Sequence, residues 1–115
     1  MSVEKLVNTA FASRDAAHCA HLKTDSYAKH EALGEFYEAL PDLVDAYAEA
    51  YQGLFGELGK LGADCKDITE KLREDLLWMT ENREDVTRGL PVLQNIYDEI
   101  TAQYLRTIFK LSRLG

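Results

Sequence analysis

The residues best suited to chemistry are histidines and carboxylates in the first half of the chain. His18 and His21 are followed by His30, and further on by Asp45 and Glu49 at a spacing of one helical turn. Neutral imidazole and carboxylate together suit iron, manganese or zinc as bound ions. Carboxylates on one helical flank repel one another unless a cation or a basic partner neutralises them. The pattern predicts a metal site with five candidate ligands: His18, His21, His30, Asp45 and Glu49.

The same residues also fit a structural interpretation without metal. An acidic flank on a helix is usually a solvated face, and a histidine near a core is usually hydrogen-bonded and inert. Arg14, His18 and Lys29 are close enough in sequence to pair with the acids and form a purely structural network. The residue types alone leave both interpretations open.

Other site chemistries find little support. Cys19 follows His18, but adjacent helical residues point about 100° apart, so the two side chains cannot form a nucleophilic dyad. The sequence has no CxxC pair, no glycine-rich phosphate loop after a strand and no HExxH motif. Cys19 and Cys65 are therefore expected to be ordinary thiols in a reducing compartment.

The charge balance limits the classes of partner. The chain has 13 basic and 20 acidic residues, a net charge of -7, which repels nucleic-acid phosphates and anionic lipid. The N-terminal segment meets charge at Glu4 and Lys5 and does not resemble a signal peptide. No apolar segment has the length needed to span a membrane. We therefore expect a cytoplasmic protein with no membrane and no nucleic-acid partner.

The candidate ligands must be positioned by helices, because the apolar period is helical nearly throughout. The period predicts an all-α protein. We expect Asp25 or Ser26 to cap the second helix, and Pro41 to kink that helix or break its register. Polar residues 82–89 are expected to form a loop. The predicted helices cover about residues 3–22, 27–52, 67–81 and 91–111.

Four helices predict a four-helix bundle, and 115 residues with 46% hydrophobic content suit a single domain over residues 1–115. Glycines at 53, 56, 59 and 62 are expected to end the second helix and to form a connection or a weak short helix. At roughly 3.3 Å per residue, residues 53–66 span at most about 46 Å, which permits a crossover along the bundle. The last two helices should be antiparallel, because their connection is short.

The run from His30, HEALGEFY, together with Asp45-Ala-Tyr-Ala-Glu49, resembles the second helix of the DNA-protecting mini-ferritins of the Dps type. The stretches SYAKHEALGEFYE and DAYAEAYQG are closer still to a small uncharacterised ferritin-like family that is commonly encoded by phages and other viruses. This resemblance covers nearly the whole chain. It implies a ferritin-like four-helix bundle with a glycine-rich connection between the second and third helices.

The resemblance also implies a role for the candidate ligands. In Dps-type proteins the corresponding histidine, aspartate and glutamate belong to a ferroxidase centre whose ligands are shared between subunits. By this likeness His30, Asp45 and Glu49 would bind iron, with manganese or zinc as alternatives, together with His18 or His21. His18 has the family's spacing to His30, whereas His21 lies more centrally on the apolar face of its own helix and is the preferred ligand of the two.

Two functions follow from these expectations. The first is a mini-ferritin-like metal-binding protein that oxidises or stores Fe(II) at a site between subunits. The alternative is a ferritin-like oligomeric scaffold or phage accessory protein that acts through protein partners. The basic tail with which many mini-ferritins hold DNA is missing. A homo-oligomer of two-fold dimers is expected because the second helix carries large aromatic residues: Phe36, Tyr37, Tyr47 and Tyr51.

Overall fold

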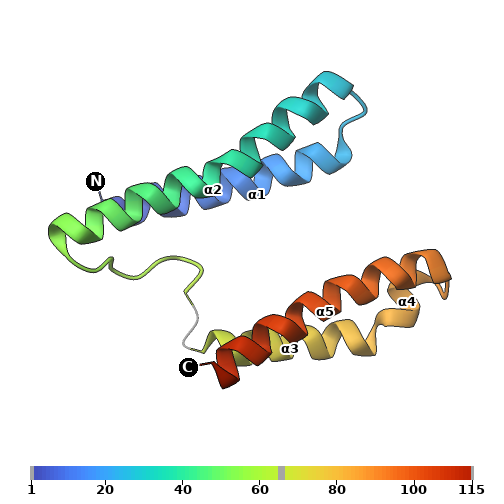
Figure 1. The fold of residues 1–115 in the computed structure, drawn as a ribbon. Helices are drawn as coiled ribbons and strands as arrows, with labels where there is room; N and C mark the ends of the chain where they lie inside the picture. The colour runs from blue at the N-terminus through green and yellow to red at the C-terminus, as the bar shows by residue number, and fades with distance from the viewer. Residues whose placement is uncertain (1, 65–66, 115) are drawn as a thin grey trace. The chain divides into compact units, whose positions relative to one another are not determined.

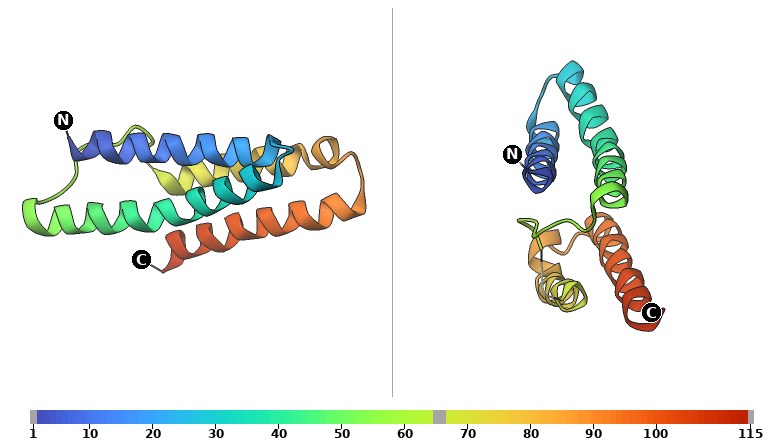
Figure 2. Two further views of the ribbon diagram at one scale, coloured as in Figure 1. Left: turned by 90° about the horizontal axis from the view of Figure 1, so that it is seen from above. Right: turned by 90° about the vertical axis from the view of Figure 1, so that its left-hand side faces the viewer.

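The computed structural model describes residues 2–64 and 67–114, and within these ranges the chain forms five helices and no strand. The all-α prediction is confirmed for the described residues. The chain divides into two compact units, residues 1–64 and 65–115. Each unit is built around a pair of antiparallel helices, which can be followed in Figures 1 and 2. The single bundle domain over residues 1–115 stays a prediction.

The first unit is a hairpin of α1 (Val3–Lys23) and α2 (Tyr27–Phe55). Ser2 caps α1, because its hydroxyl accepts a hydrogen bond from the amide of Lys5 at 3.1 Å. Ser26 rather than Asp25 is the N-cap of α2, and its hydroxyl accepts from the amide of Lys29 at 3.3 Å. The short turn between the two helices brings the end of α1 against the start of α2.

The two helices pack through stripes with alternating spacings of three and four residues, the pattern of helices that cross at a small angle. Val7, Ala17 and Val44 are the buried apolar side chains of the described residues, with exposed fractions of 2%, 8% and 9%. On α2 the stripe facing α1 recurs every seven residues, at His30, Tyr37, Val44 and Tyr51, and its members are buried or half-buried. The core of this hairpin is therefore thin.

The second helix is longer than predicted. α2 passes through Pro41 without interruption, which excludes the break in register. It also continues beyond Gln52 through Gly53 to Phe55. Gly56 follows as the C-cap, and its φ of 100° is positive, which glycine adopts without strain. Gly53 stays helical because one glycine costs a helix only about 1 kcal/mol.

The glycine-rich connection is held partly against α1. The amide of Gly59 donates to the carboxylate of Glu4 at 2.9 Å, and the amide of Gly62 donates to the side-chain oxygen of Asn8 at 2.9 Å. A polar face at the start of α1 thereby satisfies backbone donors that no helix pairs. Residues 57–64 contain no helix, so the weak short helix is not found there.

The second unit contains α3 (Ile68–Glu81), α4 (Arg83–Thr87) and α5 (Pro91–Arg113). Asp67 caps α3 by accepting a hydrogen bond from the amide of Glu70 at 3.1 Å. α3 and α5 run antiparallel, as predicted (Figure 1). The expectation of a loop over 82–89 was wrong, because α4 occupies most of it. Glu84 and Asp85 lie in the first turn of α4, where their negative charges interact favourably with the positive end of the helix dipole.

Each hairpin, taken by itself, leaves apolar side chains uncovered. Phe36, Leu43, Tyr47 and Leu54 lie on one stripe of α2, and their exposed fractions are 45%, 67%, 56% and 75%. We call these four residues the apolar stripe. On α5 the residues Leu93, Ile96 and Ile100 are similarly exposed. Such faces are typical of helices that pack against further helices, so they are compatible with a bundle.

Candidate functional site

The three histidines gather at the closed end of the α1–α2 hairpin. His18 and His21 lie in the last turns of α1, and His30 lies in the first turn of α2. The rings of His21 and His30 are stacked, with centroids 3.6 Å apart and planes inclined by 21°. His18 lies further from His21, at 6.3 Å between ring centroids. The structure thus brings together the three predicted imidazoles.

His21 and His30 also exchange hydrogen bonds. Nδ1 of His21 donates to the backbone oxygen of His30 at 2.7 Å, and Nδ1 of His30 donates to the backbone oxygen of His21 at 3.0 Å. We call this reciprocal pair the histidine clasp. Because a carbonyl oxygen can only accept, both Nδ1 atoms carry the proton. In the neutral rings the lone pair is then on Nε2, the arrangement common in metal-bound histidines.

Gly34 makes room for the clasp. A Cβ atom at this position would lie 3.2 Å from Cε1 of His21 and 3.4 Å from its Nδ1. The ring of Tyr37 lies against the same ring in a T-shaped contact, with centroids 5.2 Å apart. A side chain larger than hydrogen at residue 34 would therefore meet the His21 ring, which would have to move.

His18 is the exposed member of the cluster. Its ring stacks on Tyr37, with centroids 4.0 Å apart and planes inclined by 11°. Among the described residues no hydrogen bond engages its ring nitrogens. The His18 ring is therefore freer than the His21 ring to turn toward a metal ion.

Asp45 and Glu49 are on α2 but far from the histidines. Asp45 follows His30 by fifteen residues of one continuous helix, a distance of about 22 Å at about 1.5 Å per residue. Both side chains are exposed, and no ion pair or hydrogen bond engages them within the described ranges. They belong to an acidic flank of six residues that lies about 140° around the helix from the apolar stripe. Its members are Glu31, Glu35, Glu38, Asp42, Asp45 and Glu49.

The basic residues expected to pair with this flank form no contact with it in the described part of the chain. Arg14 pairs with Asp15 at 3.3 Å, and its guanidinium carbon lies 4.7 Å from the ring centroid of Phe11. Lys29 forms no ion pair in the described part of the chain. The structural network that would have joined Arg14, His18 and Lys29 to the acids is therefore not formed within the hairpin.

The residue types of the candidate site suit a metal ion, but their positions in the α1–α2 hairpin do not. Among the described residues no group of three or more histidine, cysteine, aspartate or glutamate side chains converges on one point. The stacked rings of His21 and His30 also cannot share one ion. A lone pair lies in the plane of its ring, and two nearly parallel planes do not meet about 2.1 Å from both nitrogens. The described residues of the α1–α2 hairpin therefore do not complete a set of ligands by themselves.

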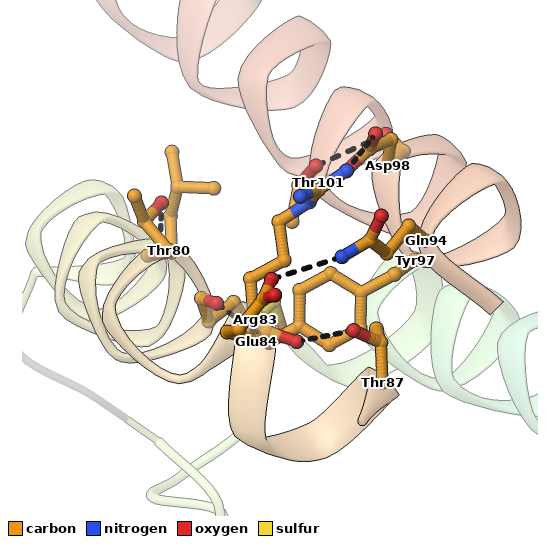
Figure 3. Close-up of polar contacts among 10 residues, drawn as sticks. Thr80, Arg83, Glu84, Thr87, Gln94, Tyr97, Asp98 and Thr101 are labelled. Atoms are coloured by element: carbon orange, nitrogen blue, oxygen red, sulfur yellow. Dashed lines mark hydrogen bonds and ion pairs between the residues drawn. The ribbon is translucent and has the colours of Figure 1, made fainter. Parts of the chain in front are cut away.

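Polar contacts in the second unit were not anticipated from the sequence (Figure 3). Arg83 donates two hydrogen bonds to the carboxylate of Asp98, from Nε at 2.7 Å and from Nη2 at 2.8 Å. These bonds lower the pKa of Asp98 and raise that of Arg83. The hydroxyl of Tyr97 donates to the backbone oxygen of Met79 at 2.6 Å. The contacts join α3 and α4 to α5 and have no evident chemical activity.

A groove in the first unit includes Leu43 and Tyr47 of the apolar stripe. It has a volume of about 190 Å³ and lies between α1 and α2. Its lining is almost wholly apolar, which suits contact with another apolar surface better than binding of a polar substrate. The lining residues are Leu6, Val7, Ala10, Leu40, Leu43, Val44 and Tyr47.

The fold and the site define a small all-helical protein with a histidine cluster at one hairpin end. Residues 21–111 match a family of unknown function (DUF5856), and the chain belongs to this family. A relative from Enterobacteria phage T4 is described as an uncharacterized 14.6 kDa protein in the mobD-ri intergenic region. It is 32% identical over 100 residues, which cover 83% of this chain and 76% of the relative. No solved structure matches the chain.

The histidine clasp, Asp45 and Glu49 all lie within the part of the chain that matches the family. His18 lies before it. Across the described ranges, no helix has the length and apolar character needed to cross a membrane.

Proposed function

We propose that the protein is a ferritin-like metal-binding protein whose site is shared between two copies of the chain. One copy supplies imidazoles from His18 and His30 at its hairpin end. The partner copy supplies carboxylates from Asp45 and Glu49. Iron is the proposed ion, with manganese and zinc as alternatives, and Fe(II) held with an open coordination position would react with an oxidant.

The observation that supports sharing is the continuity of α2. Because His30 and Asp45 are about 22 Å apart on one helix, they cannot ligate one ion from the same chain. Between two antiparallel copies of α2 the same offset favours ligation. A two-fold axis near residue 38 would place residue 30 of one copy opposite residues 45–49 of the other.

The charges of the two parts complement this arrangement. The acidic flank has six carboxylates without a partner in the described ranges, and two such flanks facing each other would repel. Bound cations would remove that repulsion. Assembly and metal binding are therefore proposed to be coupled, with tighter association in the presence of the metal.

A complementation experiment tests the shared site. One variant carries His18→Ala with His30→Asn, and the other carries Asp45→Asn with Glu49→Gln, which keeps shape and removes charge. Each variant alone should bind no Fe(II) or Zn(II), whereas a refolded equal mixture should regain about one quarter of the parental sites. That fraction follows because about half of randomly formed dimers are mixed, and each of those has one intact site.

The result that would overturn the proposal is equally direct. The variant with Asp45→Asn and Glu49→Gln is compared with the parent, both purified without a histidine tag. If the two proteins bind Fe(II), Mn(II) and Zn(II) with equal affinity, Asp45 and Glu49 are not ligands. If the parent binds metal and the mixture regains none, the ligands come from one chain.

A second candidate is an oligomeric scaffold that acts through protein partners, without a metal. The histidine clasp favours it, because the stack and the two hydrogen bonds between His21 and His30 form without a metal. A parent protein that assembles but takes up no metal in Fe(II) titration would select this candidate. For either candidate we propose the host cytoplasm as the location, on the likeness to a phage protein.

A further inference from the structure

We propose that His21 is a positioning residue, which fixes His30 in the tautomer that presents Nε2 as the ligating atom. This inference rests on the proposed function, because it assigns a task to the one imidazole that the shared site leaves unused. It is argued from the clasp, from the space around His21 and from the orientation of the two rings.

The clasp determines where the protons are. The backbone oxygen of His21 accepts the Nδ1 proton of His30 at 3.0 Å. This oxygen is held in position because the His21 ring donates in turn to the backbone oxygen of His30 at 2.7 Å. Free imidazole prefers to carry its proton on Nε2 only slightly, so a good acceptor at Nδ1 is enough to select the other tautomer.

The surroundings of His21 hold its ring still. One side lies on the backbone of Gly34, where even a methyl group would come within 3.2 Å of Cε1. The ring of His30 is stacked on it with centroids 3.6 Å apart, and the ring of Tyr37 forms a T-shaped contact with it at 5.2 Å. A ring enclosed on these sides cannot swing out to bind an ion, but it can orient its neighbour.

Side-chain amides can replace each imidazole nitrogen separately. The amide nitrogen of asparagine comes close to the position of Nδ1, and that of glutamine to the position of Nε2. His21→Asn therefore retains the donor of the clasp without the ring, whereas His21→Gln removes this donor but keeps a polar side chain. The two variants form a matched pair.

The first measurement uses the protein without metal. Nitrogen-15 NMR of the imidazole rings reports the tautomer of His30 directly. We expect the Nδ1–H form in the parent and in His21→Asn, and a mixture of tautomers in His21→Gln. If His30 keeps the Nδ1–H form in His21→Gln, the proposal is overturned.

The second measurement is the affinity for Zn(II) by calorimetry. Loss of a partner that orients a ligand typically weakens metal affinity about 10- to 100-fold. We expect this loss in His21→Gln and recovery of most of the affinity in His21→Asn. A lower number of ions bound by His21→Asn would identify His21 as a ligand and overturn the positioning role. Because the tautomer is read without metal, a parent that binds no Zn(II) would count against the proposed function and not against the clasp.

Discussion

At the scale of single residues, the clasp explains why a histidine and a glycine occupy neighbouring turns of two helices. His21 donates to the backbone of His30 only because the His21 ring can lie against α2 at Gly34. Glycine in a helix is normally unfavourable by about 1 kcal/mol relative to alanine. At this position the absence of a side chain permits a hydrogen bond and a ring stack that alanine would disturb.

Gly34→Ala and Gly53→Ala form a matched test of that statement, because both glycines are inside α2. A Cβ at Gly53 meets nothing within 4 Å. We expect Gly53→Ala to raise the free energy of unfolding by about 0.5–1 kcal/mol. Gly34→Ala should lower it by about 1 kcal/mol or more, because the ring must move. Equal stabilisation of both variants in chemical denaturation would contradict the account.

Asp98 offers a second test at this scale, through pH. Its pKa in the folded protein is lowered by the hydrogen bonds from Arg83. The charged form therefore stabilises the fold above the carboxyl's ordinary pKa of about 3.9, and this contribution is lost as the pH falls through the lower folded value. Asp98→Asn should melt below the parent at neutral pH.

The difference in melting temperature should shrink on acidification and vanish once the carboxylate of the parent is protonated. Glu99→Gln, the neighbouring change at an exposed residue, should melt with the parent throughout. A pH-independent deficit in Asp98→Asn would mean that shape rather than charge holds α4 against α5.

At the scale of elements, the long helices were predictable and the short one was not. Apolar residues recur on one face over several turns in each of the long helices α1, α2, α3 and α5. Such a period identifies a helix from sequence alone. α4 has five residues and no period. It is held instead by contacts with α5, such as the pair of Arg83 and Asp98, which are fifteen residues apart. No local pattern indicates contacts at that separation.

The candidate site was also predictable only in part. Residue types and spacing were sufficient to single out His18, His21 and His30, which do gather at the hairpin end. The partners of their nitrogens were not predictable, because a backbone oxygen becomes an acceptor only where the turn between α1 and α2 places it. Whether Asp45 and Glu49 join them in a second copy stays a prediction.

Pro41 supports a prediction for α2 as an element. Proline inside a helix removes one backbone hydrogen bond and crowds the preceding turn, which costs about 3 kcal/mol in an unconstrained helix. Pro41→Ala should therefore raise the midpoint of thermal unfolding. Gly53→Ala serves as the comparison, because it changes helix propensity in the same element without adding a hydrogen bond. An unchanged or lower midpoint for Pro41→Ala would show that the surrounding packing has adapted to the proline.

At the scale of the whole molecule, the exposed apolar surface requires cover. The four residues of the apolar stripe are each about half exposed or more, and together present on the order of 400 Å². A stable interface buries about 800 Å² on each partner, and the adjoining groove with Leu6 and Leu40 extends the surface toward that value.

Phe36 and Tyr47 are in this surface, whereas Tyr37 and Tyr51 are half-buried against α1. Only two of the four aromatic residues first assigned to an interface are therefore available to it.

Two exposed leucines separate a specific apolar contact from exposure in general. Leu43 lines the groove, and Leu22 lies at the end of α1 outside it, with similar exposed fractions of 67% and 74%. A charge introduced into an apolar contact is left without a partner when the contact forms, whereas a charge in open solvent costs little. We expect the parent to be a dimer or a larger oligomer in light scattering at micromolar concentration.

Leu43→Glu should shift the protein toward the monomer or lower its melting temperature. Leu22→Glu should leave the oligomeric state and the melting temperature unchanged. A monomeric parent would contradict the assembly and, with it, a site whose histidines and carboxylates belong to different copies, because one copy alone holds them about 22 Å apart on α2.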